Sequence, residues 1–406
     1  MADRYHFPKK TIRDIDLHDK RILLRADFNV PLTAKGEIES DFRITQTVPT
    51  IEYLLKRGCT VVVVAHLGRP EGKPNKAESL APVAKRLQEL LPGAPVTFVP
   101  TTIDDAAYQA CKRAPQGSVV LLENLRFDPG EEANDPEFAA KLQKVSGADY
   151  FVEDGFGIVH RAHASTEAIT HLLPSVAGLL LEKEVSTLEK AMKHPEHPLV
   201  AVVGGAKISD KIGFIEKLLA IADTVLIGGA MANTFLQDQG QEVGKSLVEA
   251  GQSAEIKRIH KLAKPDQILL PVDVAVSTST TEDAIRRECA VTDVNQDDYI
   301  LDVGAKTMKL FDQKLQDANT VIWNGALGLT ELPQFAKSSA DLAANMADKH
   351  HRLETIVGGG DTADFVLDWL THHKNAKFSH ISTGGGASLE LMSGLKLPGI
   401  EALMSR

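Results

Sequence analysis

The sequence predicts an α/β protein with two lobes, each a mostly parallel sheet covered by helices, joined by a helical hinge. Short, β-branched apolar runs recur along the chain, and each is followed by a polar or glycine-rich loop and a helical pattern. Continuous apolar strands that alternate with helices are typical of parallel sheets covered on both faces, so each lobe is expected to be Rossmann-like. The length of 406 residues exceeds one ordinary core and suits two domains.

The expected strands follow one another through both halves. The runs include RILLRADFNV, TVVVVAHLGRP, SVVLLENLRF, DYFVEDGFG, LVAVVGGAK, TVLIGGAMANTF, TVIWNGALG, TIVGGGDT and HISTGGGASLEL. Before about residue 180 their ends carry Asp, Asn, His and Arg, whereas after about residue 200 they carry glycines and lysines. Parallel sheets bind ligands at the carboxyl ends of their strands, which is where these residues fall.

A connecting helix is expected at 181–193. The segment LEKEVSTLEKAMK is amphipathic with mixed charge, and two prolines follow in HPEHP. It separates an N-terminal domain at 1–180 from a C-terminal domain at 194–390.

Composition indicates a protein of the cytoplasm without nucleic-acid or membrane partners. The net charge is −10, which argues against nucleic acid or an anionic membrane surface as the main partner. The N-terminus MADRYHFPKK lacks the apolar core of a signal peptide, and no apolar run is long enough to span a membrane. The three cysteines have no ligand spacing and are expected as inert thiols in a reducing compartment.

The N-terminal half collects arginines at strand ends. Asp27 and Asn29 are two residues apart on an apparent strand, so they are expected on the same side of it, with Pro31 ending the strand. The neighbouring loops add Arg43, His66, Arg69, Arg126 and Arg161. One arginine alone is more often a solvated surface group, but guanidinium groups gathered at strand ends bind carboxylate and phosphate. The pattern indicates a small, multiply anionic hydroxy acid.

Two histidines in this half have two interpretations. His160 and His163, with Glu153 and Asp154 nearby, suggest a metal site, but no third ligand stands at a diagnostic spacing. Structural or anion-binding histidines are favoured.

The C-terminal half collects glycines and lysines. In VAVVGGAKISDKI, a buried strand precedes a glycine turn, and Lys207 and Lys211 suit the opening of a helix. Glycine turns at helix N-termini offer N–H groups to phosphate. Such runs occur at Gly204–Gly205, Gly228–Gly229, Gly358–Gly360 and Gly384–Gly386. The alternative for the two lysines is an exposed helical face that pairs with acidic neighbours.

Asp361 also has two interpretations. It follows the third glycine run and suits a magnesium ion that a nucleotide brings with it, or it serves only as a helix N-cap. GQEVGKS resembles a P-loop but has the wrong glycine spacing, and no dinucleotide fingerprint follows any strand.

The assembled motifs resemble the phosphoglycerate kinase family. RADFNVP, HLGRP, LLENLRF, GGAK.SDK, TVIWNG, GGGDT and STGGGASLELM occur in the family's order and spacing along nearly the whole chain. The resemblance implies reversible transfer of a phosphoryl group between 1,3-bisphosphoglycerate and MgADP, giving 3-phosphoglycerate and MgATP. It also implies a monomer whose C-terminal residues, 391–406, pack against the first domain.

The resemblance further implies a set of site residues. Those for the triose acid are Asp27, Phe28, Asn29, Arg43, His66, Leu67, Gly68, Arg69, Arg126 and Arg161. Those for the nucleotide are Lys211, Asn324, Glu331, Gly359, Gly360, Asp361 and Thr362, with Asp361 toward Mg²⁺. The catalytic set is Arg43, Lys207, Lys211, Gly360 and Gly384, because in-line transfer needs positive charge and N–H donors around the moving group.

The chain departs from the family pattern at a few positions. Ala305 and Ala326 stand where the family commonly has proline, and EDGFGIVH replaces the more usual NDAFGTAH. A kinase for another small acid and a non-catalytic two-lobed binding protein remain the alternatives to be tested.

Overall fold

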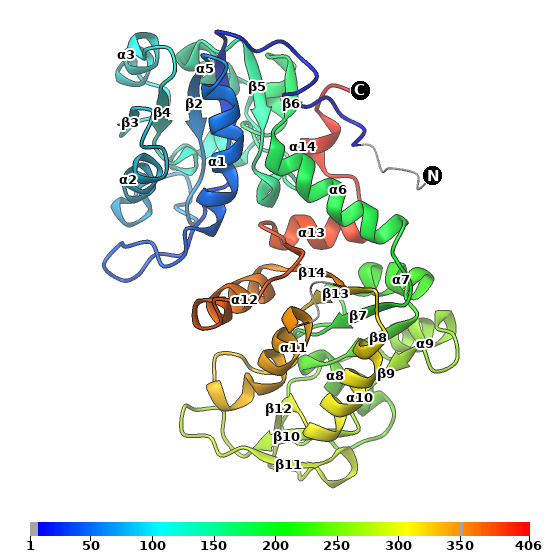
Figure 1. The fold of residues 1–406 in the computed structure, drawn as a ribbon. Helices are drawn as coiled ribbons and strands as arrows, with labels where there is room; N and C mark the ends of the chain where they lie inside the picture. Colours follow the sequence, from blue (N-terminus) through cyan, green and yellow to red (C-terminus); the bar gives the residue numbers. More distant parts are fainter. Residues whose placement is uncertain (1–6, 349–351) are drawn as a thin grey trace. The chain divides into compact units, whose positions relative to one another are not determined.

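The computed structural model describes residues 7–348 and 352–406 and divides into two compact units (Figure 1). The first unit comprises Met1–Ser186 and Lys396–Arg406, and the second comprises Thr187–Leu395. The division falls within helix α6 (Leu179–Lys193), which begins two residues before the predicted 181–193 and ends at the predicted residue. Each unit contains a six-stranded parallel sheet, which confirms the predicted α/β class.

The sheet of the first unit has the strand order β3-β4-β2-β1-β5-β6, and all its pairs are parallel. Its strands are β1 (Arg21–Arg25), β2 (Thr60–Val64), β3 (Val96–Val99), β4 (Val119–Leu122), β5 (Tyr150–Glu153) and β6 (Ser175–Ala177). The TVVVV sequence of β2 is buried throughout, as expected for a central strand covered on both faces.

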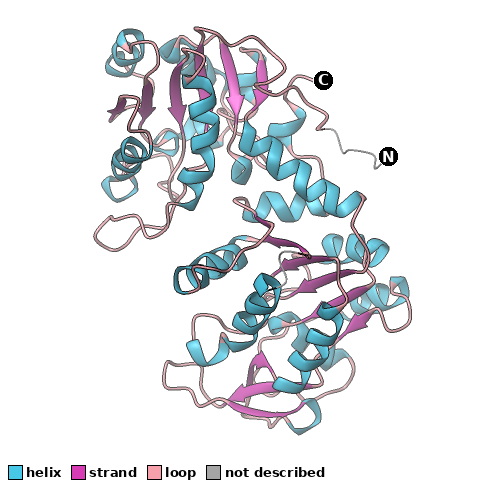
Figure 2. Ribbon diagram, viewed as in Figure 1, coloured by secondary structure: helices cyan, strands magenta, loops and turns pink. Residues whose placement is uncertain are grey.

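Helices cover both faces of this sheet (Figure 2). The helical segments of the unit are α1 (Phe42–Leu55), α2 (Ala81–Leu90), α3 (Asp105–Arg113), α4 (Pro129–Glu132), α5 (Pro136–Ser146) and α14 (Pro398–Glu401), with 3-10 turns η1 (Lys76–Glu78), η2 (Leu125–Phe127), η3 (Phe156–Ile158) and η4 (Ala168–His171). Alternate residues of β2 enter separate cores: Val61 and Val63 pack with α1 and α2, whereas Val62 packs with α3 and α5. This alternation follows from the period of two in a strand.

The C-terminal segment completes the first unit. The backbone N–H of Met404 donates to the carbonyl of Ser175 in β6 at 3.0 Å, and that of Lys10 donates to Met404 at 2.8 Å. Arg406 pairs with Asp14 at 2.9 Å. The end of the chain is therefore held against the edge of the first sheet.

The sheet of the second unit has the order β15-β14-β13-β7-β8-β9, and it is also entirely parallel. Its strands are β7 (Leu199–Val203), β8 (Thr224–Ile227), β9 (Ile268–Leu269), β13 (Thr320–Asn324), β14 (Glu354–Gly358) and β15 (His380–Ile381). The helical segments are α7 (Ile212–Ile221), α8 (Gly229–Asp238), α9 (Ser253–Leu262), α10 (Ala305–Gln316), α11 (Lys337–Asp348), α12 (Gly360–His372) and α13 (Gly385–Met392), with η5 (Val291–Asp293) and η6 (Pro333–Phe335). One core joins β7 and β13 to α10, α11 and α12 around the fully buried Trp323.

A small antiparallel sheet in the second unit was not predicted. Its strands are β10 (Asp273–Ser277), β11 (Arg287–Ala290) and β12 (Tyr299–Val303), in the order β11-β10-β12. The sequence RECA of β11 is half exposed and lacks the apolar run used to identify strands. Over the described residues, no helix combines the length and apolar character needed to cross a membrane.

Candidate functional site

The residues predicted to hold an anionic hydroxy acid gather at one edge of the first sheet. They lie in the loops after β1, β2, β4 and β5 and at the start of α1. These four strands are adjacent in the order β4-β2-β1-β5. Because the strands are parallel, their carboxyl ends meet at the same edge.

The local geometry of Asp27 and Asn29 differs from the prediction. Strand β1 ends at Arg25, so both residues lie in the following loop rather than on a strand, and Pro31 does not end it. The Asp27 carboxylate accepts from Arg43 at 2.9 Å and from the backbone N–H of Asn29 at 3.1 Å. The Asn29 side chain accepts from the backbone N–H of Gly68 at 2.9 Å. Two loops are thus fixed to each other by the polar side chains of the first.

Arg126 and His66 lie within this assembly. Arg126 donates to the carbonyl of Gly68 at 2.8 Å and pairs with Glu132 at 3.3 Å. His66 is buried, with 4% of its surface exposed. Burial, reinforced by the charges of Arg25, Arg126 and Arg43, lowers the pKa of His66 well below its ordinary value. The ring is therefore neutral at physiological pH.

The other predicted acid-site residues divide into two kinds. Arg69 and Arg161 are exposed, and their guanidinium groups have no partner among the described residues. The side chains of Phe28 and Leu67 are packed in the hydrophobic core, so only their backbone groups can face a ligand.

His160 and His163 are neutral imidazoles beside this cluster. Burial, reinforced by the charge of Arg161 on the first and of Arg25 on the second, lowers the pKa of each ring to about 4. The Nδ1 atom of His163 lies 3.9 Å from a carboxylate oxygen of Glu131. Within residues 7–348 and 352–406, no three His, Cys, Asp or Glu side chains are grouped to hold a metal ion.

The glycines of the second unit have two different roles. The N–H groups of Gly204, Gly205, Gly228 and Gly229 donate to backbone carbonyls at 2.9–3.0 Å, so they are not free for phosphate as predicted. A Cβ atom on Gly204 would lie 2.1 Å from the carbonyl oxygen of Ala326. These glycines let the chain after β7, β8 and β13 pack backbone against backbone.

The two lysines do not open a helix together. Helix α7 begins at Ile212 with Lys211 as its N-cap residue, and Lys207 is exposed in the preceding loop. The amine of Lys211 donates to the carbonyls of Gly204 at 2.8 Å and Asn324 at 3.0 Å. Burial lowers its pKa to about 8, against the opposing effect of Asp361 and Asp210. Lys211 is thus a mostly enclosed cation beside the ends of β7 and β13.

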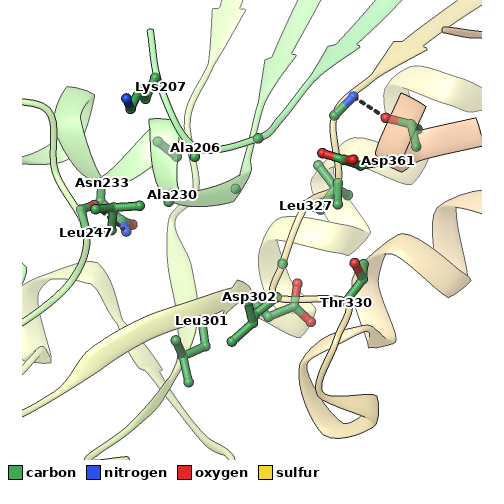
Figure 3. A pocket seen from close by; sticks show the side chains of 18 of the residues that line it. Ala206, Lys207, Ala230, Asn233, Leu247, Leu301, Asp302, Leu327, Thr330 and Asp361 are labelled. Atoms are coloured by element: carbon green, nitrogen blue, oxygen red, sulfur yellow. Dashed lines mark hydrogen bonds between the residues drawn. The ribbon is translucent and has the colours of Figure 1, made fainter. Parts of the chain in front are cut away.

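A cavity of about 1090 Å³ lies at this edge of the second sheet (Figure 3). Its lining includes Lys207, Lys211, Asn324, Glu331 and the stretch Gly359–Thr362. The predicted nucleotide residues therefore share one cavity. Of the glycines at the start of α13, Gly385 and Gly386 line it, whereas Gly384 is the N-cap residue of that helix and is not part of the lining.

The first turn of α12 lines the cavity, and the N–H of the preceding Gly359 donates to the hydroxyl of Ser388 at 3.3 Å. Gly359, at φ 92°, is the N-cap residue, so Asp361 is the second helical residue and does not cap the helix. The first N–H groups of α12 and α13 have no partners within their helices, and the helix dipoles favour an anion there. The side chain of Thr362 accepts from the backbone N–H of Gly325 at 2.7 Å and fixes the end of β13 to this turn. The exposed carboxylate of Asp361 is an oxygen ligand suited to Mg²⁺.

Several residues near the two sites were not predicted. The antiparallel sheet contributes Val274, Ile300 and Leu301 to the cavity, and Asn233 lines it while donating to the carbonyl of Leu247 at 3.2 Å. In the first unit, Arg25 is fully buried beneath His66. The sequence feature that could have identified Arg25 is a charged residue at the end of the apolar run RILLR.

The fold and the two sites define the class of the protein. It is an α/β protein with a guanidinium cluster at one sheet edge and, at another, a cavity lined by lysines and helix N-termini, which suits phosphorylated small molecules.

Comparison with known proteins gives the family. The phosphoglycerate kinase family model matches residues 12–395. The chain is 48% identical over 401 residues to phosphoglycerate kinase from Chloroflexus aggregans, covering 97% of this chain and 98% of the relative. It is 45% identical over 404 residues to that of Pelotomaculum thermopropionicum, covering 98% and 100%. The solved structure of phosphoglycerate kinase from Coxiella burnetii has a TM-score of 0.82 at 37% identity, covering 97% of this chain and 98% of that one.

The chain belongs to the phosphoglycerate kinase family. It is a nucleotide-binding kinase of glycolysis that transfers a phosphoryl group between 1,3-bisphosphoglycerate and ADP, giving 3-phosphoglycerate and ATP. The prediction of family and function is confirmed.

Proposed function

We propose that the moving phosphoryl group passes in line between the two substrates, with Arg43 on one side and Lys207 on the other. The main support for this proposal is the cavity of the second unit, where lysines and the N-termini of two helices line a space large enough for a nucleotide. A transferring phosphoryl group needs alignment and positive charge around its equatorial oxygens more than covalent help. Gly360 and the start of α13 at Gly385–Gly386 supply N–H donors to the same charge, whereas the N–H of Gly384 donates to the hydroxyl of Ser382 at 3.2 Å.

The first unit, Met1–Ser186 with Lys396–Arg406, is proposed to hold the triose acid. The guanidinium groups of Arg69 and Arg161 are exposed and have no partner in the described part of the chain, and Arg126 lies at the same sheet edge. Guanidinium groups suit the phosphate and carboxylate of the acid. Asp27 and Asn29 orient Arg43 and the His66–Arg69 loop, respectively, and leave further acceptor capacity for a hydroxyl.

The second domain, 194–390, is proposed to hold the nucleotide. Lys211 contacts nucleotide phosphates, and Glu331 faces the ribose. Asn324 lines the cavity with a buried amide nitrogen that has no hydrogen-bond partner among residues 7–348 and 352–406. Asp361 would hold the Mg²⁺ that accompanies the nucleotide, and the ion when bound neutralises phosphate charge.

The two substrates bind to different domains, so transfer requires closure. We expect bending around α6 and near α13, as in hinge enzymes generally. A monomer in the cytoplasm completes the proposal, since the net charge of −10 favours solubility and disfavours anionic surfaces.

The test is the Lys207→Ala variant in a coupled assay with 3-phosphoglycerate and MgATP. Loss of a charge clamp of this kind is expected to lower kcat by about 10²–10⁴. The matched control is Lys309→Ala, because Lys309 is exposed on α10 and does not line the cavity. Near-normal turnover by folded Lys207→Ala would refute the role. Turnover of the unmodified chain only with another acid, or binding without turnover, would contradict the assigned reaction.

A further inference from the structure

Arg25 is an arginine enclosed beneath the acid site. Its side chain is 0% exposed, although it lies at the end of β1 directly before the Asp27 loop. Nε donates to the hydroxyl of Ser165 at 2.7 Å, and another nitrogen donates to the carbonyl of Ala26. The remaining nitrogen lies 3.2 Å from Nδ1 of His66. Every face of this guanidinium is therefore directed at a specific group.

The carboxylates around Arg25 hold it in this orientation. Glu131, also 0% exposed, lies 3.7 Å from the nitrogen that faces His66. Glu131 accepts from the hydroxyl of Ser165 at 2.6 Å and from its backbone N–H at 3.0 Å. Glu153 is the register partner of Arg25 on the neighbouring strand β5. A buried cation with a paired carboxylate and three hydrogen bonds has little freedom to turn away.

The contact with Arg25 determines where the proton of His66 lies. A guanidinium group has donors only, so Nδ1 of His66 must be the acceptor in this 3.2 Å contact. A neutral imidazole whose Nδ1 accepts carries its proton on Nε2. Among the described residues Nε2 has no hydrogen-bond partner. The ring therefore offers one donor that no described residue of the chain accepts.

Burial and the neighbouring guanidinium groups favour the neutral form of the ring. Burial comes first, and the charges of Arg25 from β1, Arg126 from η2 and Arg43 from α1 add to it, whereas His163, from the loop after η3, is itself neutral. The nearby Glu131 is already engaged by Arg25 and Ser165. The position therefore disfavours both the doubly protonated ring of His66 and the neutral tautomer with its proton on Nδ1.

We propose that Arg25 is a positioning residue that holds His66 in the tautomer protonated on Nε2, so that His66 donates a hydrogen bond to an oxygen of the bound acid. The inference rests on the proposed function only for the identity of the acid that His66 contacts. A donor at this place recognises a carboxylate, phosphate or hydroxyl oxygen and rejects a group that has only donors.

The first test is nitrogen NMR on the chain with ¹⁵N-labelled histidine and no ligand. The His66 signals are assigned by their loss in His66→Gln. At about pH 8, where an ordinary histidine is neutral, we expect the proton of His66 on Nε2. A neutral ring with its proton on Nδ1 would overturn the proposal whatever the variants do.

The second test removes the donor together with its counter-charge. Arg25→Met alone would leave Glu131 buried and unpaired, so the variant is Arg25→Met/Glu131→Gln. We expect mixed tautomers of His66, a KM for 3-phosphoglycerate raised about tenfold and an unchanged KM for MgATP. Arg25→Lys, which keeps one charged donor, should have a smaller rise in the KM for 3-phosphoglycerate than the double variant. A folded double variant with an unchanged tautomer and KM would overturn the proposal.

The third test separates Arg25 from the acid site. His66→Gln keeps an N–H donor near the Nε2 position that does not depend on a ring tautomer. Adding Arg25→Met/Glu131→Gln to it should raise KM by less than twofold, and a further tenfold rise would overturn the positioning role. If His66→Gln and His66→Ala both leave the KM for 3-phosphoglycerate unchanged, the assignment of His66 to the acid fails while the NMR result for Arg25 stands.

Discussion

Lys211 is expected to make nucleotide use depend on pH in the weakly alkaline range. Its amine is enclosed near the ends of β7 and β13, and burial lowers its pKa from 10.5 to about 8. In the free enzyme, the protonated fraction is then about 0.9 at pH 7 and about 0.1 at pH 9. If only the charged amine holds nucleotide phosphates, kcat/KM for MgATP falls about tenfold over this interval.

The assay is the coupled reaction at saturating 3-phosphoglycerate with MgATP varied from about pH 6 to about pH 9.5. The comparison variant is Lys211→Arg, whose guanidinium stays charged throughout. Lys211→Arg is expected to be less active, because the larger group does not reproduce the two carbonyl contacts, but its kcat/KM should not fall above pH 8. A wild-type profile that stays flat to pH 9.5, or the same fall in Lys211→Arg, would refute the reasoning.

The same group affects stability with a definite sign. Because its folded pKa lies below its unfolded value, the unfolded chain binds more protons between these two values. The free energy of unfolding contributed by Lys211 therefore rises as pH increases from about 8 to about 10.5.

Three further predictions concern packing, a buried carboxyl and closure. Gly385→Ala would place a Cβ 2.8 Å from the backbone nitrogen of Gly360, so it should cost about 1–3 kcal/mol of stability and lower kcat/KM for MgATP at least tenfold, whereas Gly93→Ala, in open space, should change neither. Burial raises the pKa of Asp154 to about 7, against the opposing effect of the backbone N–H groups of Leu180 and Leu181. The melting temperature of the unmodified chain, measured by thermal denaturation, should therefore decrease as pH rises from about 4 to about 7. The same decrease in Asp154→Asn would contradict this assignment. Small-angle scattering should show a smaller radius of gyration with both substrates than with either one, and identical profiles would contradict the proposed closure.

Much of the fold could be predicted because its signals are local. Apolar runs such as TVVVV identify central strands, and the charge pattern with its following prolines gives the connecting helix to within two residues. The gathering of Asp27, His66 and Arg126 at one edge also follows, since parallel strands bring their carboxyl ends together. The antiparallel sheet did not follow, because β11 is half exposed and its pairing with β10 is the only reason it is a strand.

The sequence by itself determined the α/β class, the two parallel sheets and the family, because hydrophobic periodicity and the order of motifs can be read directly from the amino-acid sequence. Only the tertiary structure decided which N–H groups are free, since Gly204 and Gly229 look like donors until neighbouring loops occupy them. It also placed Arg25 against His66, Ser165 and Glu131. Such contacts join segments far apart in sequence, and their hydrogen bonding depends on which strands become neighbours, which no local pattern specifies.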